Sequence, residues 1–296
     1  MNEQPQITVI LSVLDGERFL NAALDSILTQ SFQDFEFLIT DDGSSDLTAT
    51  ILNDYADRHN NIRLFRNNNS LGLPRCLNMM AKKARGKYLA RMDADDIAHV
   101  HRFKRQIELM ENRPDLDVCF TDVDFMTEDG RIICARKTPS TITAILDMLP
   151  LISYFTHPTA FFRHSSFKKA GGYNELWLKG QDWELWQRMA NAGMRMEILE
   201  ETLLDYRLNM TGSSLRLLSG SAAKSEKYLE ANILAQNGQK IRALSLFSAL
   251  SFLERLNLFA RVLMPQSLFF FLVKVRAKYL SNSPQKRLLA QINSKK

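Results

Sequence analysis

The chain has 296 residues, of which 45% are hydrophobic and 24% charged, as in an ordinary globular protein. This length accommodates one large α/β domain with an appendage, or two small domains. The formal net charge of +5 conceals an asymmetry, because residues 1–219 carry 25 basic and 30 acidic side chains whereas residues 220–296 carry 13 and 3. The basic excess therefore lies in the C-terminal quarter.

The cysteines and the N-terminus exclude two classes of protein. Cys76, Cys119 and Cys134 lie far apart, without the spacing of a zinc site or a disulfide framework, and so fit a reducing compartment. The residues after Met1 lack the basic-then-apolar pattern of a secretion signal. We therefore expect a cytoplasmic protein.

Strands and helices alternate four times in the first part of the chain. Apolar runs predict strands at 7–13, 35–40, 62–65 and 88–92, and helical periodicity follows each of them, at 17–30, 47–58, 73–84 and 99–112. Such alternation predicts an α/β fold with a mostly parallel sheet flanked by helices. In such sheets, ligands bind beyond the carboxyl ends of the strands.

The second part is less regular. Strands are expected at 117–123, 156–163 and 195–207, and a helix at 182–192, whereas only helical patterns follow Ser219. We therefore predict a domain over 1–218 and a basic, amphipathic, helical C-terminal region over 219–296.

Acidic residues follow three of the predicted strands. Asp15 comes after the first, Asp42 after the second, and Asp93, Asp95 and Asp96 after the fourth. Carboxylates this close repel one another unless a cation lies among them, and Mg²⁺ or Mn²⁺ prefers such oxygen ligands and shares substrate phosphates. No glycine-rich phosphate loop is present, so a metal ion is expected to hold the phosphates. A solvated acidic turn is the alternative for an isolated Asp-x-Asp.

Four stretches together resemble the family 2 glycosyltransferases, which have the GT-A fold. They are ITVILSVLDGERFLNAALDSILTQSFQDFEFLITDDGSSD, NSLGLPRCLN, GKYLARMDADD and QDWELWQR, in the family's order and spacing over about residues 5–210. The resemblance implies an inverting enzyme that transfers a sugar from a nucleotide diphosphate donor, a UDP-sugar, and requires Mn²⁺ or Mg²⁺.

The resemblance also implies roles for the acidic residues. Val13, Asp15, Asp42 and Asp93 are the expected nucleotide contacts: Asp42 bonds the uracil ring, Asp93 faces the ribose, and Asp15 stands where the family usually has Asn. Asp95 is the expected metal ligand.

Asp182 corresponds to the family's catalytic base, with Gln181 in place of the usual Glu. A carboxylate near an acceptor hydroxyl can take its proton during attack, and one base opposite the leaving group gives direct displacement with inversion. A helix N-cap is the alternative role for Asp182.

Three further residues are candidates for the acceptor side or for a lid. They are His157 before Pro158, Trp183 on the predicted helix, and Arg207 before the segment 209–214. A packed, hydrogen-bonded histidine is an equal alternative for His157, and core packing is expected for Trp183 or Trp186. His99 and His101, at i and i+2 of a predicted helix, are expected on solvated surface.

The C-terminal region combines charge with aromatic and aliphatic residues. Residues 256–275 are rich in Leu and Phe, but charged residues and Pro265 interrupt a membrane-spanning length. This pattern favours an interfacial helix on an anionic membrane surface. A helical appendage packed on the domain or on another subunit is the alternative, and no recognised motif accompanies the charge for nucleic-acid binding.

These observations predict a glycosyltransferase that acts on a glycan or lipid-linked acceptor, in bacterial surface polysaccharide biosynthesis by analogy with the family. The alternative is a non-catalytic, nucleotide-sugar-binding homologue that serves as an assembly subunit, which would not need the base. A nucleotidyltransferase would show a glycine-rich, arginine-containing loop, which LDGERF matches poorly.

Overall fold

The computed structural model describes residues 4–136, 141–150 and 153–208. The predictions for segment 209–214 and for the C-terminal region 219–296 lie outside these residues. Within the described ranges, no helix is both long enough and apolar enough to cross a bilayer.

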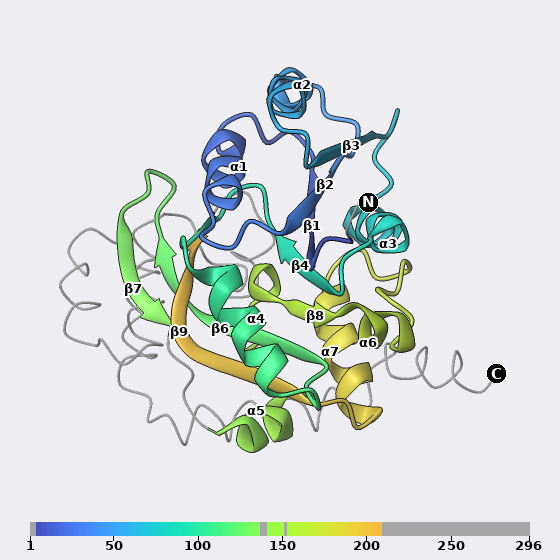
Figure 1. Ribbon diagram of the computed structural model, residues 1–296, viewed down its shortest axis with the longest axis vertical. Helices are drawn as coiled ribbons and strands as arrows, with labels where there is room; N and C mark the ends of the chain where they lie inside the picture. The colour runs from blue at the N-terminus through green and yellow to red at the C-terminus, as the bar shows by residue number, and fades with distance from the viewer. Residues whose placement is uncertain (1–3, 137–140, 151–152, 209–296) are drawn as a thin grey trace, which may run out of the picture. The chain divides into compact units, whose positions relative to one another are not determined.

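The strands of the described residues form one sheet in the order β3-β2-β1-β4-β8-β6-β9-β5, with β7 paired to β6 (Figure 1). The nine strands are β1 (Ile7–Val13), β2 (Phe35–Asp41), β3 (Ile62–Arg66), β4 (Tyr88–Met92), β5 (Ile97–Ala98), β6 (Val118–Met126), β7 (Ile132–Arg136), β8 (Phe161–Arg163) and β9 (Met196–Arg207). Strands β1 and β4 have the predicted bounds.

The sheet has a parallel half and a mixed half. Strands β3, β2, β1 and β4 are parallel neighbours, as the alternation predicts. Beyond β4, β8 is antiparallel to β4 and β6, whereas β6 and β9 are parallel. In the parallel half, the carboxyl ends of β1, β2 and β4 therefore lie at one edge.

Helices cover both faces of the sheet (Figure 1). They are α1 (Leu20–Leu28), α2 (Thr48–Arg58), α3 (Leu73–Lys83), α4 (Arg102–Asn112), α5 (Ile142–Met148), α6 (His164–Lys169) and α7 (Gln181–Asn191), with a 3-10 turn η1 (His157–Thr159). On one face, Leu77 of α3 and Trp186 of α7 share an apolar cluster with Ile10 of β1. On the other face, Phe103 of α4 packs edge-on against Phe35 of β2, with ring centroids 5.8 Å apart.

The segment after Asp96 differs from its prediction. Helix α4 begins at Arg102, and the residues before it form β5, which pairs antiparallel with β9. His99 extends this pairing: its N–H donates to the Leu203 carbonyl at 3.0 Å, and its Nε2 lies 2.6 Å from Asp205 Oδ1. The side chain of His99 is 34% exposed, so it is partly solvated as expected, but it lies beside the pairing of β5 with β9 and not on the predicted helix. His101 is exposed, as expected.

Candidate active site

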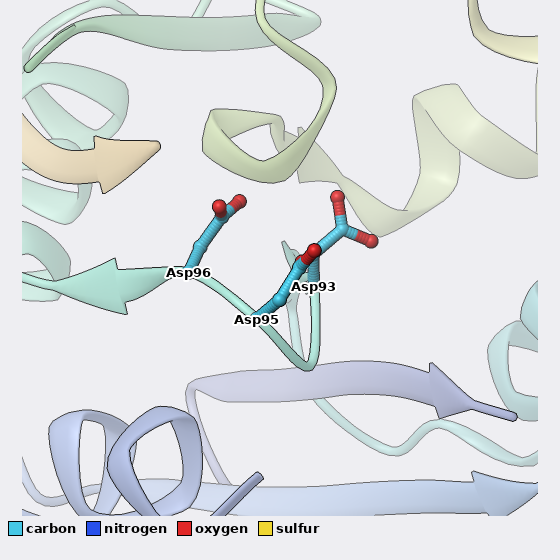
Figure 2. Close-up of side chains that lie close together, drawn as sticks. All are labelled: Asp93, Asp95 and Asp96. Carbon is cyan, nitrogen blue, oxygen red and sulfur yellow. The ribbon is translucent and has the colours of Figure 1, made fainter. Parts of the chain in front are cut away.

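Three carboxylates gather in the turn that joins β4 to β5. Figure 2 shows the side chains of Asp93, Asp95 and Asp96 leaving this turn, and one ligand oxygen from each lies within 4.8 Å of the others. The turn follows a strand that is buried throughout, so the sheet itself fixes the position of the cluster. The sequence prediction that these carboxylates are neighbours is confirmed.

The carboxylates of this turn repel one another and are partly or fully buried. Burial, followed by the charge of Asp93, raises the pKa of Asp95 to about 6. Burial and the charges of Asp95 and Asp93 raise the pKa of Asp96 well above its ordinary value. Ionisation of Asp95 and Asp96 is therefore unfavourable without a compensating positive charge.

Asp96 has an oxygen that lacks a protein partner. Its Oδ1 accepts a hydrogen bond from the Arg207 N–H at 2.8 Å, whereas Oδ2 is buried without a partner in the described residues. Three carboxylates with one orphaned oxygen fit a hard divalent cation such as Mg²⁺ or Mn²⁺. The residues present therefore suit the metal ion that the sequence resemblance implies.

Arg207 fastens the acidic turn to two other segments. Its guanidinium donates to the carbonyls of Asp95 and Glu128, at 2.7 Å each, and lies 4.4 Å from the centre of the Phe19 ring. Arg207 is buried, and its described contacts are with the protein. Its expected role at the acceptor or in a lid stays a prediction.

Asp42 accepts five hydrogen bonds at the end of β2. Its oxygens accept from the backbone N–H groups of Leu71 (2.8 Å) and Gly72 (2.9 Å), and from three side chains of the same segment. These are Asn67, Ser70 and Cys76, at 2.7, 2.8 and 3.2 Å. Burial raises the pKa of Asp42, but the bonds led by Leu71 outweigh it and the pKa is lowered.

A carboxylate offers about four lone-pair positions, so these five donors saturate Asp42. The expected bond from Asp42 to a uracil ring stays a prediction. The structure adds a second task, since Asp42 holds the loop over residues 67–72. The stretch NSLGLPRCLN covers part of this loop and was noted in the sequence, but only the structure shows that the loop binds Asp42.

Val13 and Asp15 lie where β1 ends, beside the end of β2. The Val13 carbonyl accepts from the Asp42 N–H at 2.8 Å, and Asp15 Oδ1 accepts from the Ser45 N–H at 2.8 Å. Asp15 has a φ of 51°, a left-handed conformation that Asp and Asn tolerate better than most residues. This explains why Asp can stand where the resembling family has Asn.

Asp182 lies in the first turn of α7. Gly180, with a φ of 70°, is the N-cap and no side chain caps the helix, so the alternative of Asp182 as the cap is wrong. Burial raises the pKa of Asp182, while the Trp183 N–H and the charge of Arg91 lower it in part. A raised pKa brings a carboxylate closer to the range of an effective general base at neutral pH.

His157 and the tryptophans belong mainly to the packed interior. His157 is buried, its Nε2 lies 2.8 Å from the Tyr173 hydroxyl, and burial lowers its pKa well below the ordinary value. This is the geometry of the packed alternative. Trp186 is fully buried, whereas Trp183 is half-buried and donates from Nε1 to the Leu149 carbonyl at 2.6 Å. An acceptor contact by His157 or Trp183 stays a prediction.

Sequence reasoning missed Arg91. Its guanidinium is buried in β4 and donates to both carboxylate oxygens of Asp93. Its charge also acts on the pKa of Asp182, so Arg91, Asp93 and Asp182 share one electrostatic environment. The signal was visible, because a charged residue interrupts the apolar run YLARM.

Comparison with known proteins places this site in a family. The model of glycosyl transferase family 2 matches residues 8–171. An uncharacterised glycosyltransferase of Methanocaldococcus jannaschii is 31% identical over 209 residues, covering 70% of this chain and 72% of the relative. The O-antigen biosynthesis glycosyltransferase WbnJ of Escherichia coli is 30% identical over 211 residues, covering 69% and 80%.

A third relative has a name that states both its donor and its acceptor. The UDP-Gal:alpha-D-GlcNAc-diphosphoundecaprenol beta-1,3-galactosyltransferase of Escherichia coli is 27% identical over 215 residues, covering 70% of this chain and 76% of the relative.

Two solved structures share the fold. Staphylococcus aureus TarS in complex with UDP-GlcNAc has a TM-score of 0.59 at 18% identity, over 87% of this chain and 70% of that one. The mannosyltransferase PcManGT of Pyrobaculum calidifontis, in complex with GDP-Man and Mn²⁺, has a TM-score of 0.57 at 16% identity, over 99% and 85%. The GT-A fold expected from the sequence is confirmed.

Proposed function

Since the chain belongs to glycosyl transferase family 2, we propose that it moves a sugar from a UDP-sugar to a glycan or lipid-linked acceptor, with inversion. The observation that carries the proposal is the pairing of an acidic turn suited to a divalent cation with a desolvated carboxylate, Asp182, in the same electrostatic environment. The first suits a diphosphate leaving group and the second suits proton abstraction.

The reaction is a single displacement. The acceptor hydroxyl oxygen forms a bond to the anomeric carbon, the bond from that carbon to the diphosphate oxygen breaks, and the Asp182 carboxylate takes the hydroxyl proton. Asp95 and Asp96 would hold a Mg²⁺ or Mn²⁺ ion, which when bound would supply positive charge for the departing nucleoside diphosphate. Val13, Asp15, Asp42 and Asp93 form the nucleotide side, and His157, Trp183 and Arg207 remain candidates for the acceptor side.

Named relatives support this choice of substrates. WbnJ is an O-antigen enzyme, and the galactosyltransferase relative uses a UDP-sugar and a diphosphoundecaprenol-linked acceptor. A role in surface polysaccharide biosynthesis with a cytoplasmic, nucleotide-linked donor is consistent with both. The non-catalytic alternative would account for the acidic turn as a binding site, but it gives no role to the desolvated carboxylate of Asp182.

The proposal is tested by screening the purified full chain against a panel of UDP- and GDP-sugars, with Mn²⁺, with Mg²⁺ and with EDTA. We expect metal-dependent hydrolysis or transfer with at least one UDP-sugar. Nucleotide-sugar binding without turnover, when lipid-linked and glycan acceptors are supplied, would instead favour the non-catalytic homologue.

The C-terminal region carries a separate part of the proposal, peripheral association with an anionic membrane. Residues 220–296 hold 13 basic and 3 acidic side chains together with Phe269, Phe270 and Phe271. Apolar insertion and electrostatic attraction both promote binding to anionic lipid. Deletion from Leu256 onward should weaken co-sedimentation with anionic vesicles and spare nucleotide binding. Equal sedimentation of both proteins, or of neither, would contradict membrane association.

A further inference from the structure

Arg91 is a buried cation that the proposed reaction does not itself require. It lies in β4 between apolar neighbours and is 2% exposed. Burial lowers the pKa of the guanidinium, but the charge and hydrogen bonds of Asp93 outweigh burial, and the pKa is raised. Placing a guanidinium in an interior is unfavourable unless it is paired. Its partners therefore indicate what it does.

The guanidinium holds Asp93 in one orientation. Both terminal nitrogens of Arg91 donate to the two oxygens of Asp93, which is the forked geometry that gives Arg–carboxylate pairs directional specificity. The main chain of Arg91 is itself fixed, because its N–H donates to the Ala160 carbonyl at 2.9 Å and its carbonyl accepts from Arg102 at 2.8 Å. Three segments of the fold thus determine where the Asp93 carboxylate points.

This pairing gives Asp93 a different role from those of Asp95 and Asp96. Arg91 uses about two of the four lone-pair positions of Asp93, and the remaining positions can accept hydrogen bonds from hydroxyl groups. Asp96, by contrast, keeps a buried oxygen without a partner among the described residues. Asp93 is thereby suited to hydroxyls of a nucleotide sugar, and Asp95 and Asp96 to the cation.

The charge of Arg91 also acts on residues beyond Asp93. It lowers the pKa values of Asp182 and His157, although burial has the larger effect on each of them.

We propose that Arg91 is a positioning residue, which fixes the Asp93 carboxylate as a hydroxyl acceptor for the nucleotide sugar and keeps it from ligating the metal ion. The expected effect of Arg91 on donor binding rests on the proposed function, whereas its expected effect on metal binding does not. Removal of Arg91 has opposite consequences for the two ligands: Mn²⁺ gains a free carboxylate, whereas the donor loses an oriented one.

The test compares wild type with Arg91→Gln, Arg91→Lys, Asp93→Asn and the double variant Arg91→Gln/Asp93→Asn. Mn²⁺ affinity without nucleotide is measured by electron paramagnetic resonance, and kcat and KM are measured for the donor. Arg91→Gln should bind Mn²⁺ several-fold more tightly and lose roughly 10- to 100-fold in kcat/KM, mainly through KM. Arg91→Lys keeps the charge without the fork, so its Mn²⁺ affinity should stay near wild type while its KM rises.

The double variant makes the inference decisive. If Arg91 acts through Asp93, Arg91→Gln should add little to either effect in the Asp93→Asn background, because the two residues are then coupled. Arg163→Gln is the matched control, since it removes a half-buried guanidinium from β8, beside the other end of β4. It should lower stability and leave Mn²⁺ affinity unchanged.

Three results overturn the inference: Mn²⁺ affinity that is unchanged or weaker in folded Arg91→Gln, additive effects in the double variant, or the same changes in Arg163→Gln. If Arg91→Gln does not fold, the comparison of Arg91→Lys with the double variant, which retains no unpaired buried charge, decides between the two outcomes. Absence of transfer by the wild-type protein would reject the proposed function, but the Mn²⁺ comparison would still test the role of Arg91.

Discussion

Asp42, which follows β2, is buried and Asp182, in the first turn of α7, is partly buried, but the surroundings of the two carboxylates differ. Five donors from residues 67–76 surround Asp42 and lower its pKa, whereas burial dominates at Asp182 and raises its pKa. A carboxylate of the first kind is a stable hydrogen-bond acceptor, and one of the second kind takes up a proton more readily. Under the proposed function, the first kind suits the donor side of the site and the second suits the base.

The largest expected effect is in the acidic turn. Asp95→Ala should lose Mn²⁺-dependent UDP binding altogether, because a ligand of the cation is removed, while the fold survives since the turn is partly exposed. Calorimetry with UDP and Mn²⁺ measures this loss. Asp57→Ala on the exposed face of α2 is the control and should bind normally. Unchanged affinity in Asp95→Ala would move the metal site elsewhere.

Asp182→Asn should separate chemistry from binding. The amide keeps the size of the side chain but cannot accept the proton, so kcat should fall by roughly 10²–10⁴-fold while UDP affinity is retained. Asp182 must be ionised to act as the base, and its pKa is raised. In wild type, the loss of activity on acidification should therefore begin at a higher pH than an ordinary aspartate would give. Glu184→Gln, which loses only its pair with Arg188, should keep this profile. Near-normal turnover of Asp182→Asn would assign the base to another residue.

Asp42→Asn should destabilise the loop over residues 67–72 and leave the candidate base, Asp182, unchanged. The amide NH₂ faces donors, so the loop over 67–72 loosens and the free energy of unfolding should fall by about 1–3 kcal/mol. Because the pKa of Asp42 is lowered in the folded state, its stabilisation is present above the ordinary aspartate pKa and is lost as the pH falls through the folded value. Urea titrations at several pH values should show a smaller acid dependence in the variant. An equal dependence in both proteins would contradict the role of these bonds.

The smallest expected effect is at His99, where β5 meets β9. The hydrogen bond with Asp205 raises the pKa of His99 above 6.5. Its stabilisation is therefore full below the ordinary histidine pKa and is lost as the pH rises through the folded value. Thermal unfolding should show that His99→Gln destabilises the protein at pH 5.5, by less than about 1 kcal/mol for this partly exposed pair, and less at pH 8.5. His101→Gln should show no such difference.

The division of the sheet into a parallel half and a mixed half explains what the sequence could predict. In the parallel half, short and mainly apolar runs predicted β1 and β4, and the rule that parallel strands end at one edge predicted that Asp15, Asp42 and Asp93 lie together. In the mixed half, partners come from distant segments: β5 on β9, His157 on Tyr173, and Arg207 on the acidic turn. Local periodicity carries no information about such pairings. For that reason the strand β5, the partner of His99 and the five donors of Asp42 needed the fold, whereas Asp182 came from a motif.

The loop that Asp42 holds bears on the design of variants with altered donor choice. A substitution at Asp42 would disturb the path of the main chain from Asn67 to Gly72 before it changed any contact with a base. The side chain of Leu71 offers a better starting point: its N–H is anchored on Asp42, while the side chain is 43% exposed. A library at Leu71 would vary the surface of the loop and keep its backbone in place, and so could explore nucleotide preference in a folded protein.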